Sequence, residues 1–372
     1  MKHKILVTGG AGFIGSFIVD SLVKKGNLVT IYDNLEPQIH PNSKPEYINT
    51  KANFAKGDVR DYDLIKKYIL DSDIIINFAA RVGVGQSMYE VKEYVTTNEV
   101  GTANIMHAIA NEKHHVKKII VASSMSIYGD GSYFCQKCKK EVYDVERTQE
   151  QLKQQKWEMY CPGCKSVLTP IPTNESKPIN SGSVYAISKK NQEELTLNIG
   201  KAYGIPGVAL RLWNTYGPRQ SLSNPYTGVA AIFMSRIKNN NSPMIFEDGK
   251  QSRDFVSVYD VVQAVELSIE KKEADNESFN VGSGEKITIN EVAQMLLDIF
   301  GSKLKPIANN KYRTGDVRHC FADISKIKSK LGYKPKISLK KGMEELVEWS
   351  KTKDAKDMVN EAFKELQNKK LV

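Results

Sequence analysis

A glycine-rich turn near the N-terminus constrains the fold of this 372-residue chain more than any other feature. Residues 4–8 form a short apolar run, and Gly9, Gly12 and Gly15 follow it. Residues 13–25 then have the apolar spacing of a helix. A buried strand that turns through glycines into a helix is typical of a dinucleotide-binding unit, in which the helix N-terminus holds a pyrophosphate. A tight turn without a ligand fits the same three glycines, so other residues must separate the two interpretations.

The chain after this turn alternates between apolar strands and helices. Strands are expected at residues 28–32, 74–78, 118–123 and 208–212, and helices at 93–111 and from Ser183 onward. This alternation predicts an α/β fold with a Rossmann-type doubly wound parallel sheet, whose ligands bind at the carboxyl ends of the strands. The alternation is interrupted at residues 131–172, and beyond Tyr216 the pattern is mixed.

Two carboxylates indicate which dinucleotide this sheet would hold. Asp33 ends the expected second strand. A carboxylate in that place accepts hydrogen bonds from the adenosine ribose and repels a 2′-phosphate, so the sequence favours NAD over NADP. Asp58 is placed to meet the adenine, although a loop or helix-capping carboxylate is an equally ordinary use of this residue.

Tyr185 and Lys189 lie four residues apart at the start of an expected helix. This spacing puts both side chains on one face of the helix. A free tyrosine has a pKa of about 10, which is too high for a base at neutral pH. Because a nearby ammonium group favours the phenolate, we expect the pKa of Tyr185 to be lowered. The pair predicts a phenolic base beside a nicotinamide ring.

The composition is that of an ordinary globular protein with a formal net charge of +10. Its lysines are scattered, which indicates a solvated basic surface; a positive field that attracts an anionic small molecule is the alternative, and nucleic acid is not an expected partner. No apolar run approaches the roughly 20 residues of a membrane span. The apolar start reaches glycine too soon for a signal peptide, so we expect a cytoplasmic protein.

Four of the five cysteines lie in the interrupting residues 131–172, in the pairs Cys135/Cys138 and Cys161/Cys164. Two such pairs are the ligand set of a closed structural zinc site, and the insert resembles a zinc ribbon. Iron and unliganded redox thiols stay open as alternatives, whereas disulfides do not suit a reducing compartment. Acidic and basic side chains nearly balance within the insert, which disfavours a ribbon that binds nucleic acid.

The motifs taken together resemble the extended short-chain dehydrogenase/reductase superfamily and, within it, the NAD-dependent nucleotide-sugar epimerase/dehydratase family. The resemblance covers residues 3–350 apart from the cysteine insert. Besides the glycine turn, it is carried by Asp33, Asp58, Asn77 to Ala80, Asn98, Ser123 to Gly129, Tyr185, Lys189, Arg211 to Asn214, Arg253 to Val256 and Arg313 to Asp316.

This resemblance implies tightly bound NAD and a set of cofactor residues. They are Gly9, Gly12, Phe13, Ile14, Gly15, Asp33, Asn34, Asp58, Val59, Phe78, Ala79, Ala80, Asn98, Tyr185, Lys189 and Leu212. In the family, the tyrosine takes the proton from the C4 hydroxyl while a hydride passes to NAD, and the lysine also holds the nicotinamide ribose.

The resemblance also implies catalytic and substrate-binding residues. Ser124, Tyr185 and Lys189 would be catalytic, with Ser124 binding the reacting sugar oxygen. Two arginines would clamp the diphosphate, since a planar guanidinium pairs with phosphate oxygens, although surface salt bridges are the alternative. The implied substrate residues are Ser124, Ser126, Asn214, Arg253, Arg313 and Asp316, the last as a ligand of the nucleoside ribose.

The residues after Ser124 indicate the reaction. Dehydratases of the family carry Asp-Glu there and decarboxylating members have an acid at the second position, whereas this chain has Met125 and Ser126. The remaining reaction is 4-epimerisation through a transient 4-keto sugar. A related dehydratase or a reductase that releases its product stays open, and the presence of the catalytic residues disfavours a non-enzymatic scaffold or redox sensor.

A narrower resemblance, in residues 33–41, residues 80–89 and the insert, is to a dTDP-L-rhamnose 4-epimerase-like branch that forms dTDP-6-deoxy-L-talose or acts in reverse. A UDP-GlcNAc/UDP-Glc-type 4-epimerase is the alternative. Cys320 stands where some hexose 4-epimerases carry a bulky aromatic that limits the pocket, and it is either such a specificity position or a buried small hydrophobe. A role in polysaccharide biosynthesis follows from the resemblance.

These inferences divide the chain into three parts. Residues 1–215 are expected to form the NAD-binding Rossmann domain with the insert at 131–172, residues 216–350 mainly a smaller mixed α/β domain for the nucleotide sugar, and residues 351–372 a helical tail. The insert starts after the strand bearing Ser124 and ends before Tyr185, so we expect it to support or cover the sugar pocket or to join a subunit contact. The family implies a homodimer formed through helices at 93–111 and 183–200.

Overall fold

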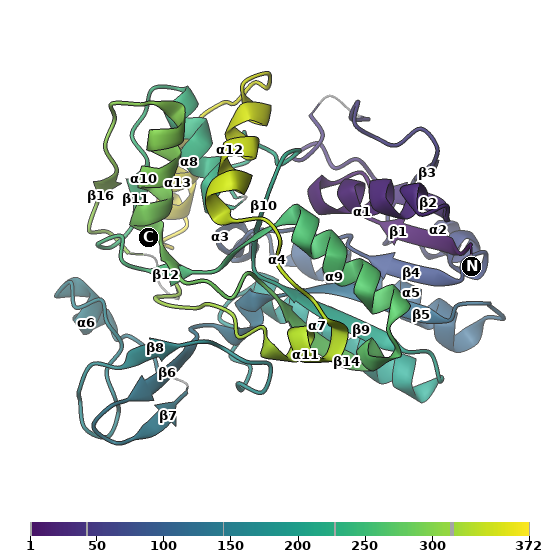
Figure 1. Cartoon of the computed structure of the whole chain (residues 1–372), viewed down its shortest axis with the longest axis horizontal. Coiled ribbons are helices and arrows are strands. Elements are labelled where there is room, and N and C mark those ends of the chain that lie inside the picture. The colour runs from purple at the N-terminus through teal and green to yellow at the C-terminus, as the bar shows by residue number, and fades with distance from the viewer. Residues whose placement is uncertain (1, 42–43, 144, 227, 313–315, 372) are drawn as a thin grey trace.

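A computed structural model of the chain describes residues 2–41, 44–143, 145–226, 228–312 and 316–371. A central sheet runs through the larger part of the molecule, a smaller helical part stands on one end, and the cysteine insert projects at the lower left of Figure 1. Within the described ranges, no helix is long and apolar enough to cross a membrane.

The central sheet confirms the predicted Rossmann-type fold. In the described residues it has seven strands, all parallel, in the order β14-β9-β5-β4-β1-β2-β3. The order reverses between β1 and β4, and such a reversal opens a crevice for ligands at the carboxyl ends of the strands. The strands are β1 Lys4–Thr8, β2 Leu28–Asp33, β3 Asn53–Lys56, β4 Ile74–Asn77, β5 Lys118–Ser124, β9 Gly207–Leu212 and β14 Glu277–Val281.

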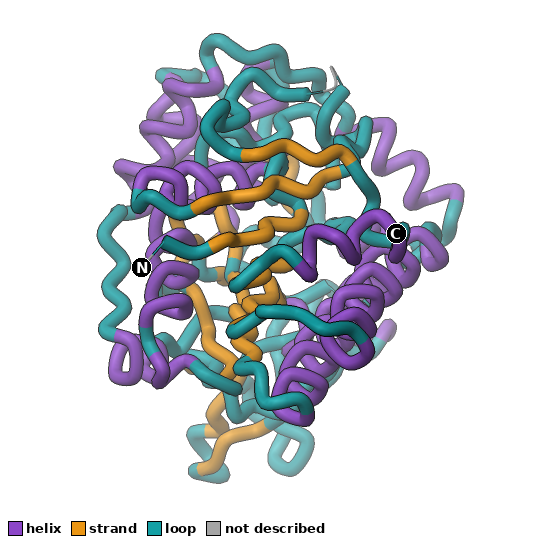
Figure 2. Tube along the Cα trace, turned by 90° about the vertical axis from the view of Figure 1, so that its right-hand side faces the viewer, coloured by secondary structure: helices purple, strands orange, loops and turns teal. Residues whose placement is uncertain are grey.

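Helices cover both faces of this sheet because its strands are apolar on both sides. Ile5 and Val7 of β1 face one core and Leu6 faces the other. Helices α1 and α9 pack on the first face, and α2, α5 and α7 on the second. Figure 2 shows the strands between helices. The helices are α1 Phe13–Lys24, α2 Tyr62–Leu70, α3 Val84–Ser87, α4 Val91–Tyr94, α5 Gly101–Asn111, α7 Val184–Ala202, α9 Val258–Glu270 and α11 Ser325–Leu331.

The helix expected at residues 93–111 is not one regular α-helix. A π-helical segment, η1 Val95–Val100, separates α4 from α5. It contains Asn98, whose side chain accepts a hydrogen bond from the Arg81 backbone N–H and donates one to the Ser188 hydroxyl. The wider turn therefore coincides with a buried polar residue that is held by two other segments, as π-bulges often are at functional sites.

The chain beyond Tyr216 forms a second core and then returns to the sheet. Helices α8, α10 and α12 enclose the second core, whereas α9 and β14 complete the Rossmann layers. The elements of this part are β10 Asn214–Tyr216, α8 Val229–Lys238, β11 Met244–Ile245, β12 Ser252–Arg253, β13 Phe255–Ser257, η3 Lys272–Ala274, β15 Ile287–Thr288, α10 Ile289–Phe300, β16 Ile307–Ala308, α12 Leu339–Ser350 and α13 Val359–Asn368. The division of roles between residues 1–215 and 216–350 stays a prediction.

The cysteine insert is a small three-stranded antiparallel sheet in the order β7-β6-β8. It follows the 3-10 turn η2 Met125–Tyr128 at the end of β5. Its elements are β6 Ser132–Cys135, β7 Lys140–Val142, α6 Gln149–Lys153 and β8 Thr169–Ile171.

Candidate active site and cysteine cluster

A cavity of about 340 Å³ lies at the carboxyl ends of the central strands. The cavity is lined by the glycine turn after β1, the loop after β2 and the end of β5. These segments lie at the same edge of the sheet because the strands are parallel. The predicted cofactor residues that line it are Gly9, Gly12, Phe13, Ile14, Gly15, Asp33, Asn34, Val59, Phe78, Ala79, Ala80, Tyr185, Lys189 and Leu212, and Ser124 lines it as well. Asp58 and Asn98 lie outside the lining.

The glycine turn is packed too closely for side chains at two of the three glycines of its motif. Gly9 has φ +69°, and a Cβ there would stand 2.8 Å from the Phe78 carbonyl. A Cβ on Gly15 would stand 2.1 Å from the Gly9 oxygen, so neither position accepts a side chain. Gly12 caps α1 without a side-chain hydrogen bond. The helix N-terminus therefore presents backbone N–H groups to the cavity, and these suit an anion.

Asp33 is fixed at the end of β2 with its carboxylate toward this turn. It accepts hydrogen bonds from the N–H groups of Ala11 at 3.0 Å and Leu35 at 2.8 Å. Asp58 is used differently, because it accepts hydrogen bonds from Arg60 and from the Asn34 amide. Burial acts to raise the pKa of Asp58, but these hydrogen bonds hold it below its usual value. Asp58 thus has partners within its own loop and in the loop after β2, and its contact with the adenine stays a prediction.

Ser124 and Tyr185 meet at the sheet end of the cavity. The Ser124 hydroxyl accepts hydrogen bonds from the N–H and the hydroxyl of Ser126. Ser183 caps α7 by accepting the Ala186 N–H, which places Tyr185 in the first helical turn. Burial raises the pKa of Tyr185, while the hydrogen bond with Ser124 acts to lower it. The expected lowering of this pKa is therefore wrong for this structure, because the desolvation of the phenol depends on burial that a local sequence pattern does not reveal.

Lys189 belongs to a buried polar chain that sequence reasoning missed. Its ammonium donates to the Gln192 side-chain oxygen at 2.7 Å, and the Gln192 amide donates to the Thr102 hydroxyl at 2.8 Å. Asn77 also donates to Thr102 and accepts from Thr8. Burial lowers the pKa of Lys189 to about 7, against the opposing effect of Glu193. Gln192 thus orients the lysine that lines the cavity.

The loop after β2 closes over the cavity through amide contacts that were also missed. Gln38 donates to the side chains of Gln86 at 3.1 Å and Asn224 at 3.2 Å, and all three residues line the cavity. Arg81 forms an ion pair with Glu90 at 3.2 Å. Residues 33–41 and 80–89 stood out in the sequence, but a pattern of ordinary amides does not reveal this contact.

Of the predicted substrate residues that the structure describes, Ser124 lines the cavity, whereas Ser126, Asn214, Arg253 and Asp316 lie outside its lining. Asn214 donates to the Asp254 carbonyl beside the paired strands β10 and β13. Arg253 donates to the carbonyls of Val317 and Arg318 and lies 3.9 Å from the Asp316 carboxylate. Arg313 lies outside the described residues. Cys320 is buried in the main hydrophobic core and is not among the cavity residues.

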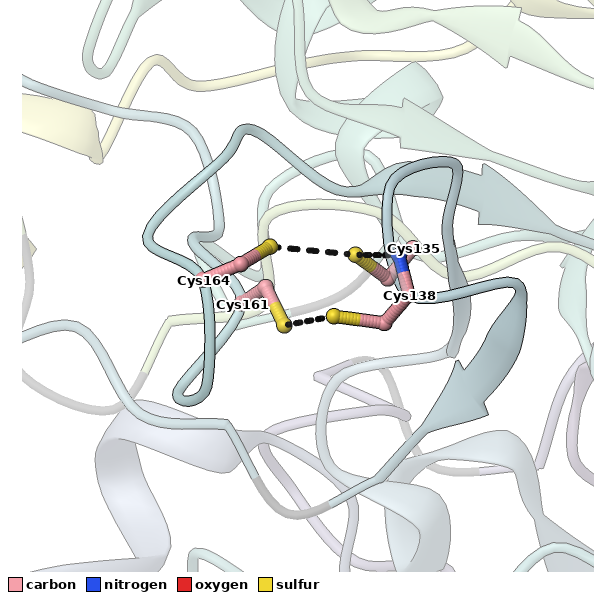
Figure 3. Close-up of side chains that lie close together, drawn as sticks. All are labelled: Cys135, Cys138, Cys161 and Cys164. Carbon is pink, nitrogen blue, oxygen red and sulfur yellow. Dashed lines mark hydrogen bonds between the residues drawn. The ribbon is translucent and has the colours of Figure 1, made fainter.

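The four insert cysteines converge on one point, as Figure 3 shows. Their sulfurs all lie within 4.8 Å of one another, with Cys135 and Cys164 3.5 Å apart and Cys138 and Cys161 3.9 Å apart. Tetrahedral zinc with bonds of about 2.3 Å requires sulfur separations of about 3.8 Å. The cluster therefore fits one tetrahedral metal ion, and its four ligands leave no position for a substrate.

Comparisons with known proteins agree with this arrangement. The model of the NAD dependent epimerase/dehydratase family matches residues 5–156, and that of GDP-mannose 4,6 dehydratase matches residues 166–346. The chain is 36% identical to a dTDP-L-rhamnose 4-epimerase of Burkholderia thailandensis, over 93% of this chain and 94% of that protein.

Two solved structures show the same fold over nearly the whole chain. UDP-glucose 4-epimerase of Thermotoga maritima with UDP-glucose has a TM-score of 0.76 at 32% identity and covers 94% of this chain and 98% of its own. The Thermus thermophilus UDP-glucose 4-epimerase complex with NAD has a TM-score of 0.75 at 27% identity, with coverages of 94% and 100%. The glycine turn, the cavity and these likenesses agree: the chain belongs to the NAD dependent epimerase/dehydratase family of extended short-chain dehydrogenases/reductases.

Proposed function

We propose that this protein is an NAD-dependent nucleotide-sugar 4-epimerase. The observation that carries the proposal is the group Ser124, Tyr185 and Lys189 at one cavity, with no acid in the following turn. Two carboxylates line the cavity: Asp33 ends β2 and Glu36 follows it. Strand β2 lies three positions from β5 in the sheet, so these carboxylates are about 14 Å from the strand that carries Ser124. The dehydratase and decarboxylating branches that the chain resembles carry an acid beside the catalytic serine, so reversible oxidation at C4 is the chemistry that these residues suit.

The chain's residues have distinct tasks in this reaction. When bound, NAD supplies the reversible hydride acceptor for the sugar C4. Ser124 holds the C4 oxygen, and Tyr185 takes its proton as the C4–O bond becomes a carbonyl. After the flat 4-keto sugar has turned over, Tyr185 returns the proton as hydride returns to the opposite face. Because burial favours the neutral phenol, a positive charge from Lys189 is needed to stabilise the phenolate.

The substrate we favour is the dTDP-L-rhamnose/dTDP-6-deoxy-L-talose pair, supported by the 36% identical Burkholderia relative. A UDP-sugar is the second candidate, supported by the Thermotoga structure with UDP-glucose. Incubation with dTDP-L-rhamnose, UDP-glucose or UDP-GlcNAc, without added cofactor, is followed by NMR. Interconversion of C4 epimers supports the proposal, whereas loss of water, or no change in any of the three sugars, contradicts it.

We further propose that the nucleotide end of the substrate binds along Asn214, Arg253 and Asp316, with the sugar at Ser124 and Ser126. Asn214 supports this path because it lies between the cavity and Arg253: its amide approaches the Met125 sulfur at 3.6 Å.

We also propose a homodimer through the side of the molecule that carries α5 and α7. Exposed apolar side chains on α4, η1 and α7 support this proposal. These are Val91, Val100 and Ile187.

We predict that Asp33→Ser weakens NAD binding roughly 30-fold and allows NADP to bind. The reason is that hydrogen bonds from the ribose to a carboxylate contribute about 2 kcal/mol, and their loss also removes the repulsion of a 2′-phosphate. Nucleotides released from the denatured protein are identified by chromatography. The exposed Asp63→Ser serves as the control and should retain wild-type NAD. Undiminished NAD and no NADP in the Asp33 variant would contradict the assignment.

We propose that the cysteine cluster holds one structural zinc ion, which the sulfur separations support. Elemental analysis of the purified protein is expected to give about one zinc per chain, since four thiolates form a closed site. Cys138→Ser should remove most of it, whereas Cys320→Ser, outside the cluster, should retain it. Iron in the wild type would assign a different metal, and unchanged metal in the Cys138 variant would show that these cysteines are not the ligands.

A further inference from the structure

We propose that the cysteine insert couples metal binding to nucleotide binding, because it holds the segment Asp316–His319 in place. Metal in the cluster and a nucleoside diphosphate at Arg253 and Asp316 would then increase each other's affinity. This inference rests on the proposed function, which gives Arg253 and Asp316 their nucleotide role. The insert is thereby a positioning element, remote from the reacting carbon.

The insert depends on its cluster for structure. Its buried core comprises few residues, and two of them are proposed metal ligands: Tyr133, Cys135, Val142, Met159, Cys161 and Leu168. A core of this size rarely folds without a metal or disulfides, and the described cysteines form no disulfide. In such domains the free energy of metal binding contributes directly to folding. Loss of the metal should therefore release the whole insert.

Glu158 of the insert forms an ion pair with Arg318, whose side chain is fully buried. The Glu158 carboxylate lies 2.5 Å from the Arg318 guanidinium and accepts a second hydrogen bond from His319 at 3.0 Å. His319 donates to Glu158 because its other ring nitrogen accepts from the Ser252 N–H. Arg318 also pairs with Glu247 at 2.9 Å and Asp248 at 2.7 Å. Thus the insert supplies one of three carboxylates around a buried guanidinium.

Arg147 of the insert reaches the proposed nucleotide residue itself. Its guanidinium donates to the Asp316 carbonyl at 2.7 Å and to the Glu247 carboxylate at 2.6 Å. The Arg147 and Glu247 side chains are 5% and 2% exposed, so water barely screens this pair. Glu247 also donates its backbone N–H to the Lys311 carbonyl. Arg147 therefore holds the backbone of Asp316 from the insert side.

Arg253 holds the backbone of the next two residues. It donates to the carbonyls of Val317 at 2.5 Å and Arg318 at 3.1 Å. Three consecutive carbonyls are thus held by a guanidinium of the insert and by the guanidinium proposed to meet the diphosphate. Because the two arginines share one short stretch of backbone, disorder of the insert should displace Asp316 and Arg253 together. Two sites that stabilise the same arrangement of a segment are coupled, and the coupling is reciprocal.

The test measures zinc affinity of the full-length protein by competition with a zinc chelator, with and without UDP or dTDP. Binding of each diphosphate is measured separately by calorimetry. We expect the better-bound diphosphate to raise zinc affinity on the order of tenfold, a usual size for coupling between two sites. Glu158→Gln and Arg147→Met should each abolish most of this effect. Glu150→Gln, the same substitution at an exposed insert position, should leave it intact.

The outcomes separate this inference from the proposed function. If the wild type binds UDP or dTDP but its zinc affinity does not change, the coupling is wrong and the nucleotide-sugar assignment stands. If neither diphosphate binds, the proposed function fails and the inference with it.

The Cys138→Ser variant gives a second test. Its KM for the nucleotide sugar that the enzyme turns over should rise about tenfold, while bound NAD and kcat at saturation stay unchanged. An unchanged KM in a metal-free variant would overturn the proposal.

Discussion

Tyr185→Phe should lower kcat by about 10²–10⁴-fold, the usual contribution of a positioned acid–base group. The phenol and Ser124 line the same cavity, so in the proposed mechanism removal of the phenol hydroxyl leaves the C4 hydroxyl without a proton acceptor. The ring remains, and the glycine turn and Asp33 are untouched. Bound NAD should therefore stay at the wild-type level while turnover is lost, as measured by nucleotide analysis and NMR on the same sample.

Tyr203→Phe is the matched control for this loss. Tyr203 ends the same helix, α7, and its side chain is exposed, so the control should keep full activity. Wild-type turnover in Tyr185→Phe would exclude the phenol as the base. Loss of NAD together with activity would instead show that Tyr185 acts mainly in cofactor binding.

Glu193→Gln should lower the free energy of unfolding by about 3–5 kcal/mol, the usual effect of removing one partner of a buried ion pair. Glu193 lies 2.6 Å from Arg211, and the two side chains are 4% and 6% exposed. The pair joins α7, the helix that carries Tyr185 and Lys189, to β9 of the sheet. The substitution removes the carboxylate that accepts from this buried guanidinium, whose other hydrogen-bond acceptors among the described residues are the neutral Tyr128 hydroxyl and the Glu175 carbonyl. Urea denaturation measures the change.

Glu194→Gln controls for the substitution itself. Glu194 is the next residue of α7 and pairs with Lys190 at 3.5 Å on the exposed face. Exposed pairs of this kind contribute at most about 1 kcal/mol. A loss in Glu193→Gln as small as in this control would mean that the buried pair adds little to stability.

Local patterns carried most of the fold prediction. The glycine turn is recognised by its spacing. The strands at residues 4–8 and 74–77 are short apolar runs, because burial on both faces of a parallel sheet favours such runs. The late return of β14 to the sheet and the π-helix at Asn98 were not predictable. Both depend on tertiary partners: β14 pairs with β9, and Asn98 contacts Arg81 and Ser188.

The site was predictable to the extent that its chemistry lies in fixed spacings. The four-residue interval of Tyr185 and Lys189 and the paired cysteines put these residues together in the structure. Gln192 was missed because an amide on a helix has no signature until the fold buries it beside Lys189. The insert was expected to support the sugar pocket, but its contacts were missed for a similar reason, since Glu158 and Arg318 are 160 residues apart in sequence.

The most direct test of the central claim follows the C4 hydrogen. The nucleotide sugar that the protein turns over is labelled with deuterium at C4 and incubated in ordinary water, and its unlabelled form is incubated in deuterated water. Because Tyr185 exchanges only the hydroxyl proton, both C4 epimers should keep the deuterium at C4 in the first experiment and gain none on carbon in the second. Loss of the label to solvent, or solvent deuterium at C4, would contradict epimerisation by hydride transfer.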